Sequence, residues 1–455
     1  MTALAEYAAR IEANARRLGL HYNGVDFELV PERFMMETAV YGLPVRMPHW
    51  SFGVRYIRQL VQRNMGHSRI FEVMFPGDPC KAYLVDVNSL AENVLVVAHV
   101  LGHADFAHRN ALFQRSLSMA GGKILEQAAA RAHRIEAALA KHGQERVEAV
   151  LDAALALEAH IDINRPLYRS RDGEDEDEPQ TLDDDPFRRR WDTLPGEQAP
   201  VEPKKTPRTT PLRPAYDLLW FIAHYGPELE EWERDAFLAV REESFYFYPV
   251  FACQIMNEGW ASYWHARLLR EVDLLPSDIY VSAIKTHSDV VQPHAAGRTL
   301  ALSVNPYHLG FSMWERIVET HGLEAARRIC AEEDDFGFVR NHLDQDLADR
   351  LDLFVFEASA DGSISVASRE IHAIREAILA PRFNFGVPRV AATKLDVDGT
   401  LTLTHDHQSD GRGLDLKRAE RVLDYVVRVW RRPVTLHTVD EQGAARVLSA
   451  RPNSH

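Results

Sequence analysis

Helical periodicity dominates the pattern of apolar and polar positions along this 455-residue chain. Apolar side chains recur every three to four residues among Ala, Glu and Arg, which is typical of helices that pack one face on a core. The segments predicted as helices are 4–18, 50–64, 89–105, 112–142, 144–160, 216–224, 230–243, 254–271 and 310–332. The pattern therefore predicts an α-rich core.

A short β signal stands just before the helix predicted at 89–105. Arg69-Ile-Phe-Glu-Val-Met-Phe75 and Ala82-Tyr-Leu-Val85 flank the turn-forming Pro76-Gly-Asp-Pro79, which predicts a hairpin. The structural role open to this hairpin is to cover the core.

The pattern changes after about residue 353. Alternating segments at 353–356, 363–366, 389–392 and 401–404 predict strands, with helices at 368–379 and 416–432 between them. We therefore expect a mainly α fold (α+β), with a helical core over 1–352 and a smaller C-terminal α+β module over 353–455. Regulation, assembly, partner binding and a purely structural cap are all compatible with such a module.

Charge is concentrated in the middle of the chain. Residues 168–215 hold the acidic runs Glu174-Asp-Glu-Asp-Glu178 and Asp183-Asp-Asp185, a basic cluster and a Pro-rich stretch, so we expect a loop or linker within the core domain. A docking tail for a basic partner and a lid over a cleft are the functional alternatives. The net charge of −15 argues against broad nucleic-acid binding, which needs a basic surface.

Composition also indicates where the protein works. The first ten residues lack a basic region followed by an apolar stretch, so we expect an amphipathic helix and not a signal peptide. No apolar run reaches the roughly 18 residues that a membrane span needs. Three widely separated cysteines, Cys80, Cys253 and Cys330, favour a reducing compartment and core positions over disulfides or zinc ligands. A cytoplasmic location is expected.

The sharpest candidate chemistry is the histidine pair His99 and His103. The pair Ser89 and Glu92 forms a capping-box pattern that marks the start of the helix. The two imidazoles are four residues apart on this helix, so they point the same way and can share a metal ion. The alternative is a core helix whose histidines are satisfied by hydrogen bonds.

Asn257-Glu-Gly-Trp-Ala-Ser-Tyr-Trp-His265 supplies a third candidate ligand, Glu258, with Ser262 and His265 on the same helix face. Two His and one Glu form the ligand set of one class of catalytic zinc centres. Glu258 could instead be a capping or salt-bridged carboxylate. In the metalloprotease motif His-Glu-x-x-His the Glu is the general base, whereas here that position is Val100, so another group would have to activate water.

Two further residues are candidates for catalysis. His265 could shuttle a proton, and Tyr307 in Asn305-Pro-Tyr-His-Leu-Gly310 could donate to a developing oxyanion. Structural roles are equally open: His265 could support Glu258, and Tyr307 could be a buried hydrogen-bonding aromatic. Beyond these, His287 and His294 could line the pocket, and Asp105 and Asn110 could support the ligands.

Four long motifs resemble the SpoVR family of bacterial stage V sporulation R-like proteins. They are Tyr41-Gly-Leu-Pro-Val-Arg-Met-Pro-His-Trp-Ser-Phe-Gly53, Ala98-His-Val-Leu-Gly-His-Ala-Asp-Phe106, Asn257-Glu-Gly-Trp-Ala-Ser-Tyr-Trp-His265 and Asn305-Pro-Tyr-His-Leu-Gly310. The resemblance implies a bacterial intracellular protein linked to spore cortex assembly or to stress responses. It also implies partners, a PrkA-like serine kinase and a von Willebrand A-type protein. A weaker similarity, to gluzincin metallopeptidases, rests on the two helices that carry the candidate ligands. By analogy with gluzincin sites, the predicted hairpin could form one wall of the cleft.

These observations favour a gluzincin-like core that holds a divalent metal, zinc first, through His99, His103 and Glu258. The expected activity is hydrolysis of an amide or peptide bond, with a cell-wall precursor as a candidate substrate. The alternative is a non-enzymatic regulatory or scaffold protein that works with the PrkA-like kinase.

Overall fold

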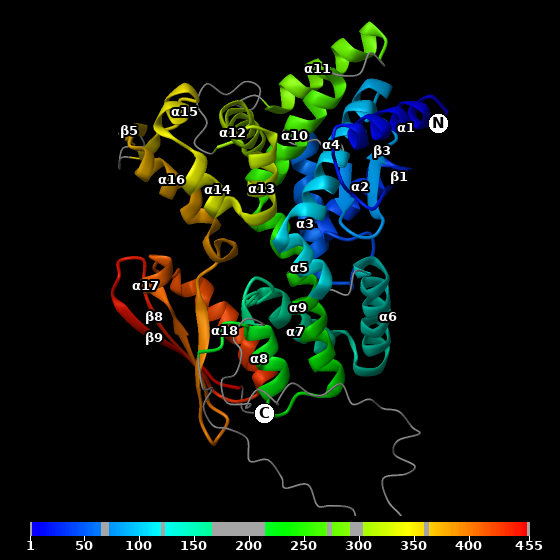
Figure 1. Ribbon diagram of the computed structural model, residues 1–455. Coiled ribbons are helices and arrows are strands. Elements are labelled where there is room, and N and C mark those ends of the chain that lie inside the picture. The colour runs from blue at the N-terminus through cyan, green and yellow to red at the C-terminus, as the bar shows by residue number, and fades with distance from the viewer. Residues whose placement is uncertain are drawn as a thin grey trace, which may run out of the picture. The chain divides into compact units, whose positions relative to one another are not determined.

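The computed structural model describes residues 2–64, 72–119, 123–165, 214–270, 275–291, 304–358 and 364–452. The chain forms two compact units (Figure 1): one comprises Met1–Ala159 and Glu230–Pro388, and the other His160–Leu229 and Arg389–His455. The acidic and Pro-rich segment predicted at 168–215 lies almost wholly outside the described residues.

The first unit is mostly helical. Its helices are α1 (Thr2–Arg17), α2 (Glu32–Tyr41), α3 (Trp50–Asn64), α4 (Leu90–Arg109), α5 (Ala111–Met119), α6 (Ile124–His142), α7 (Gln144–Ala156), α9 (Glu231–Ala252), α10 (Gln254–Arg270), α11 (Ser277–Val291), α12 (Pro306–His321), α13 (Leu323–Glu332), α14 (Asp335–His342), α15 (Gln345–Arg350) and α16 (Ile371–Leu379), followed by the 3-10 segment η2 (Ala380–Gly386). The prediction of a mainly α fold with small sheets is confirmed.

The helix predicted at 310–332 is in fact two helices. Gly322 separates α12 from α13 with a φ of 81°, a left-handed conformation that glycine adopts without the steric cost of a side chain. The single helix predicted at 112–142 is likewise divided into α5 and α6.

Three helices at the centre of the first unit, α4, α10 and α12, pack unusually closely. A Cβ atom on Gly102 of α4 would lie 2.6 Å from the Cα of Ala261 in α10, and one on Gly259 of α10 would lie 2.5 Å from the Cα of Gly310 in α12. Real side chains do not tolerate such distances, so glycine permits both crossings. Buried Trp260 and Trp314 fill the space beside these crossings, with ring centroids 4.8 Å apart.

A three-stranded sheet packs against α4. The predicted hairpin is confirmed: β2 (Glu72–Phe75) pairs antiparallel with β3 (Cys80–Val85). A third strand, β1 (Val25–Val30), was not predicted and pairs parallel with β3, so the strand order is β1-β3-β2 and β2 is an edge strand. A second, two-stranded sheet joins β4 (Val355–Ala358) to β5 (Ile364–Ser368).

The second unit combines helices with a four-stranded sheet of order β6-β7-β8-β9. Its elements are α8 (Leu218–Tyr225), β6 (Val390–Leu395), β7 (Leu401–His405), α17 (His407–Asp410), α18 (Leu416–Trp430), β8 (Val434–Val439) and β9 (Ala445–Ala450). Residues 353–388 belong to the first compact unit and not to the second. The separate domain that we expected over 353–455 stays a prediction. Among the described residues, no helix is both long enough and apolar enough to cross a membrane.

Candidate metal centre

Helix α4 presents the histidine pair as the sequence predicts. The Ser89 hydroxyl accepts from the Glu92 amide at 3.2 Å, and the Glu92 carboxylate accepts from the Ser89 amide at 2.7 Å, so the capping box forms and fixes the start of the helix. One turn apart on the same face, the His99 and His103 rings lie with centroids 4.5 Å apart, and both are buried.

Helix α10 brings Glu258 to the same point. Its Oε2 atom lies 3.5 Å from Nε2 of His99 and 3.5 Å from Nε2 of His103. The start of α10 is held by buried Asp335 of α14, whose carboxylate accepts from the amides of Ile255 and Met256 at 2.9 and 3.0 Å. The structure thus brings the three predicted ligands together.

The three side chains suit a metal ion. Neither His99 Nε2 nor Glu258 Oε2 has a hydrogen-bond partner among the described residues, although buried polar atoms normally have one. Ligand atoms around a tetrahedral zinc ion with bonds of about 2.0–2.1 Å lie about 3.3 Å apart, close to the 3.5 Å found here.

The electrostatics of the site agree with this fit. Burial by itself would raise the pKa of Glu258, but His103 and His99 outweigh burial and hold it well below its ordinary value. Burial by itself would lower the pKa of His103, and the Glu258 carboxylate reverses that effect, so the pKa is raised. Glu258 is therefore an anion at neutral pH, as a metal ligand must be.

The second nitrogen of each histidine has a defined partner. His103 Nδ1 lies 2.9 Å from Oδ1 of Asn257, and His99 Nδ1 lies 2.9 Å from Nδ1 of His265. Since an amide oxygen can only accept, His103 donates from Nδ1 and leaves Nε2 free to bind a cation. Asn257 was not singled out from the sequence, although it directly precedes Glu258.

His265 continues into a chain of histidines. Its Nε2 atom makes a short hydrogen bond with Nδ1 of His287 on α11. Burial, first among the causes, holds the pKa of His265 well below its ordinary value and lowers that of His287 to about 4, so both rings are neutral at pH 7. If His99 Nε2 binds a cation, the proton on its Nδ1 faces His265, whose own proton faces His287.

Tyr307 lies beside the same cluster. Asn305 caps α12 by accepting from the Tyr307 amide at 3.0 Å, and the Tyr307 ring stacks on His99 with centroids 6.2 Å apart. The negative charge of Glu258, followed by burial, raises the pKa of Tyr307 well above its ordinary value. Tyr307 is therefore a neutral phenol that can donate a hydrogen bond.

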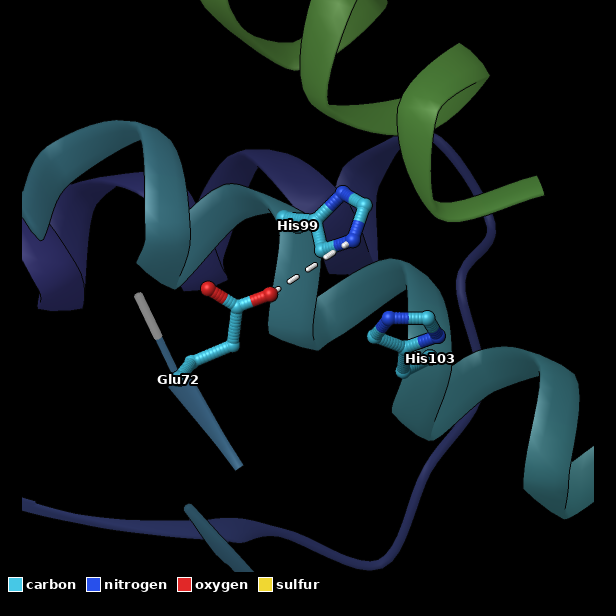
Figure 2. Close-up of side chains that lie close together, drawn as sticks. All are labelled: Glu72, His99 and His103. Carbon is cyan, nitrogen blue, oxygen red and sulfur yellow. Dashed lines mark ion pairs between the residues drawn. The ribbon is translucent and has the colours of Figure 1, made fainter. Parts of the chain in front are cut away.

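Sequence reasoning missed Glu72. The carboxylate comes from the edge strand β2 and approaches the histidine pair (Figure 2), with Oε1 3.9 Å from His99 Nε2. The available signal was a carboxylate preceding the apolar residues of a strand that we expected to line a cleft.

Other candidates have structural roles. Asp105 accepts from Trp260 Nε1 at 2.9 Å and from the His21 amide at 2.7 Å, and Asn110 ends α4 and donates to the Cys330 carbonyl at 2.8 Å. Cys253 is buried in the core, and burial raises the pKa of its thiol well above the ordinary value. His294 lies outside the described residues.

Comparisons with known proteins cover almost the whole chain. The model of a family described as SpoVR like protein matches residues 1–386, and that of the SpoVR-like C-terminal domain matches residues 388–441. The chain is 27% identical over 495 residues to a protein of Escherichia coli (strain K12) named "Uncharacterized protein YcgB", covering 98% of this chain and 94% of that protein. No solved structure matches the chain, and the expected gluzincin likeness stays a prediction.

Proposed function

Because the chain belongs to the SpoVR family, whose relative in Escherichia coli is named as uncharacterised, we propose its function from the site: a metal-dependent hydrolase of amide or peptide bonds. The observation that carries the proposal is the convergence of His99, His103 and Glu258. The Glu258 Oε2 atom lies 3.5 Å from the Nε2 atoms of both histidines and has no hydrogen-bond partner among the described residues. Two His and one Glu are the protein ligands of catalytic zinc sites in several peptidases, which makes zinc the first ion to test.

A divalent cation in this place would supply Lewis-acid polarisation of a carbonyl and a more acidic water. The residues of the chain would supply the rest. Asn257 and His265 orient the two imidazoles through their Nδ1 atoms, and Tyr307, a neutral phenol beside Glu258, is suited to donate to an oxyanion.

The proposed substrate class is an amide or peptide in a cell-wall precursor. Support for it comes from the sequence resemblance, which links such proteins to the spore cortex and to stress physiology. Amide hydrolysis suits the site because its tetrahedral intermediate develops negative charge on oxygen, next to the proposed cation and a phenol donor.

A first experiment measures metal content by elemental mass spectrometry on untagged protein, comparing the unaltered chain with His99→Ala, His103→Ala and Glu258→Ala. His133→Ala is the matched control, because His133 lies on α6 with 81% of its side chain exposed. We expect one divalent metal ion per chain, lost in the three site variants and retained in the control. A metal-free protein that cannot be loaded with zinc, iron or manganese would overturn the proposal.

A second experiment tests turnover. The metal-loaded chain is assayed against cell-wall peptide and N-acyl amino sugar substrates, and we expect release of product that disappears in His99→Ala and Glu258→Ala. Metal binding with no turnover on these substrates would count against the hydrolase and favour the second candidate.

The second candidate is a regulatory or scaffold protein that works with a PrkA-like serine kinase and a von Willebrand A-type protein. The observation that favours it is Val100, because the residue after the first histidine supplies the general base in His-Glu-x-x-His peptidases. A scaffold would retain these partners in pull-down experiments when His99 is replaced, and it would lose them when its binding surface is altered.

A further inference from the structure

A second carboxylate, from a strand and not a helix, approaches the histidine pair. Glu72 is the first residue of β2, and its carboxylate points toward His99 (Figure 2). The ligand atoms of Glu72, His99 and His103 all lie within 4.8 Å of one another, and Glu72 Oε1 is 3.9 Å from His99 Nε2. Two carboxylates and two imidazoles therefore converge from a strand and two helices.

Local packing explains why Glu72 points inward. β2 is an edge strand whose register with β3 is fixed, Glu72 opposite Leu84 and Met74 opposite Ala82, and β2 also contacts α4. Side chains alternate between the two faces of a strand, so the register that buries Phe75 also determines the face on which Glu72 lies.

The charge of these four side chains in their ligand forms matches that of a divalent cation. The side chains of Glu72 and Glu258 are only 18% and 20% exposed, and the ion pairs that the described residues make with them come from His99 and His103. As metal ligands the imidazoles are neutral and the carboxylates ionised, so the four side chains would carry two negative charges, which a divalent cation would neutralise.

We propose that Glu72 is a fourth protein ligand, so that Glu72, His99, His103 and Glu258 form a His2Glu2 site for a six-coordinate divalent cation, iron(II) or manganese(II). This inference rests on the metal site of the proposed function and extends it. Four protein donors would complete the coordination of a tetrahedral zinc ion, as in structural sites, whereas a six-coordinate cation keeps two positions for water and substrate. Mixed imidazole and carboxylate donors suit iron(II) and manganese(II).

The test uses cobalt(II) as a probe, because its visible absorption is intense with four ligands and weak with six. The full-length apo protein is titrated with cobalt(II), manganese(II) and iron(II) under anaerobic conditions, alongside Glu72→Gln, which keeps the size of the side chain and removes its charge. Glu28→Gln is the matched control, since Glu28 is an exposed residue on β1 of the same sheet.

We expect weak, six-coordinate cobalt absorption in the unaltered protein and in Glu28→Gln. In Glu72→Gln we expect affinity for manganese(II) to fall by roughly 100-fold, at the upper end of the 10–100-fold loss that is typical when a residue supporting a ligand is removed. Equal affinity and an identical spectrum in Glu72→Gln would overturn the role of Glu72, while metal loss in His99→Ala would still support the proposed function.

Two further outcomes are decisive. If circular dichroism shows that Glu72→Gln does not fold, the cobalt(II) spectrum of the unaltered protein becomes the deciding measurement. An intense four-coordinate spectrum would then overturn the six-coordinate site. If the unaltered protein binds none of the three ions or zinc, the inference and the proposed function fail together.

Discussion

Gly102 of α4 lies directly against Ala261 of α10, where a Cβ atom on Gly102 would come within 2.6 Å of the Ala261 Cα and 3.3 Å of its Cβ. Gly102 is the neighbour of His103, and Ala261 is three residues from Glu258. The contact therefore fixes how closely the helix that carries the histidines approaches the helix that carries the carboxylate.

Replacing Gly102 by Ala should destabilise the protein and separate the ligands. We expect the free energy of unfolding to fall by about 1–3 kcal/mol, the usual cost of overpacking a core, and the affinity for metal to fall with it. Denaturant unfolding and metal titration measure the two effects. Gly53→Ala on α3 is the control, because a Cβ there meets no atom within 4 Å, and helix propensity predicts a gain of about 0.5–1 kcal/mol. Equal effects at the two positions would contradict the packing argument.

Asp335 should make the free energy of unfolding depend on pH. Burial raises its pKa from 3.8 to about 7, so the folded state binds this proton more tightly than the unfolded chain. The stabilisation that this proton gives the folded state is fully present below about pH 4 and is lost as the pH rises through 7. At about 1.4 kcal/mol per pKa unit, the loss in the free energy of unfolding is up to about 4 kcal/mol.

Asp335→Asn removes that proton equilibrium. We expect the free energy of unfolding of the variant, relative to the unaltered chain, to rise between pH 4 and pH 8 in denaturant titrations. Asp344→Asn, at the N-cap of α15, is the matched control, because this half-exposed carboxylate also accepts from a backbone amide. A relative stability of Asp335→Asn that does not change with pH would refute the argument.

His265 should act on metal binding through His99. Without the ring that meets His99 Nδ1 at 2.9 Å, the orientation and tautomer of His99 are no longer fixed. We expect His265→Ala to weaken metal binding by roughly 10–100-fold. Calorimetric titration measures the affinity, with His133→Ala on the exposed face of α6 as the control. An unchanged affinity in His265→Ala would show that the histidine chain does not position His99.

Asn257 should act on metal binding through His103, because its side-chain oxygen accepts the hydrogen bond from His103 Nδ1. Asn257→Ala removes the oxygen that lies 2.9 Å from His103 Nδ1, and a loss of metal affinity of roughly 10–100-fold is expected. Asn257→Asp keeps an acceptor oxygen at that position, so its affinity should stay closer to that of the unaltered chain. If Asp and Ala weaken binding equally, the hydrogen bond is not the cause.

Tyr307 should affect turnover and not metal binding. Tyr307→Phe keeps the ring that stacks on His99 but removes the hydroxyl beside Glu258. We expect kcat to fall by roughly 100-fold, as when an oxyanion donor is lost, while the metal content stays at one ion per chain. Steady-state kinetics and elemental analysis of the same samples separate the two effects, and loss of metal in Tyr307→Phe would show that the residue is structural.

Sequence patterns predicted the local structure of the site well. The capping pair Ser89 and Glu92, the four-residue histidine spacing and the hairpin before α4 depend on contacts between residues close in the chain, so they could be read directly. The structure also brings Glu258, His265 and Tyr307 to His99, while their roles stay predictions.

Long-range contacts account for what was missed. β1 was not predicted as a strand, and its pairing with β3 across roughly 50 intervening residues is a long-range contact that local periodicity does not record. Glu72 stood in a predicted strand, but the register that directs it toward α4 depends on β3 and on the buried Phe75. Gly322 shows the opposite case, because a single glycine at a φ of 81° overrode a continuous helical pattern.

The candidate ligands lie on β2, α4 and α10, and the histidines that meet at the site, His99 and His265, are 166 residues apart in the chain. An unfolded chain cannot hold these groups together, so a cation bound there would bind the folded protein alone. Free metal at 100 times the dissociation constant would add about 2.7 kcal/mol to the free energy of unfolding. Metal starvation would then lower the abundance of the protein in the cell by exposing it to proteases, with no change in its synthesis.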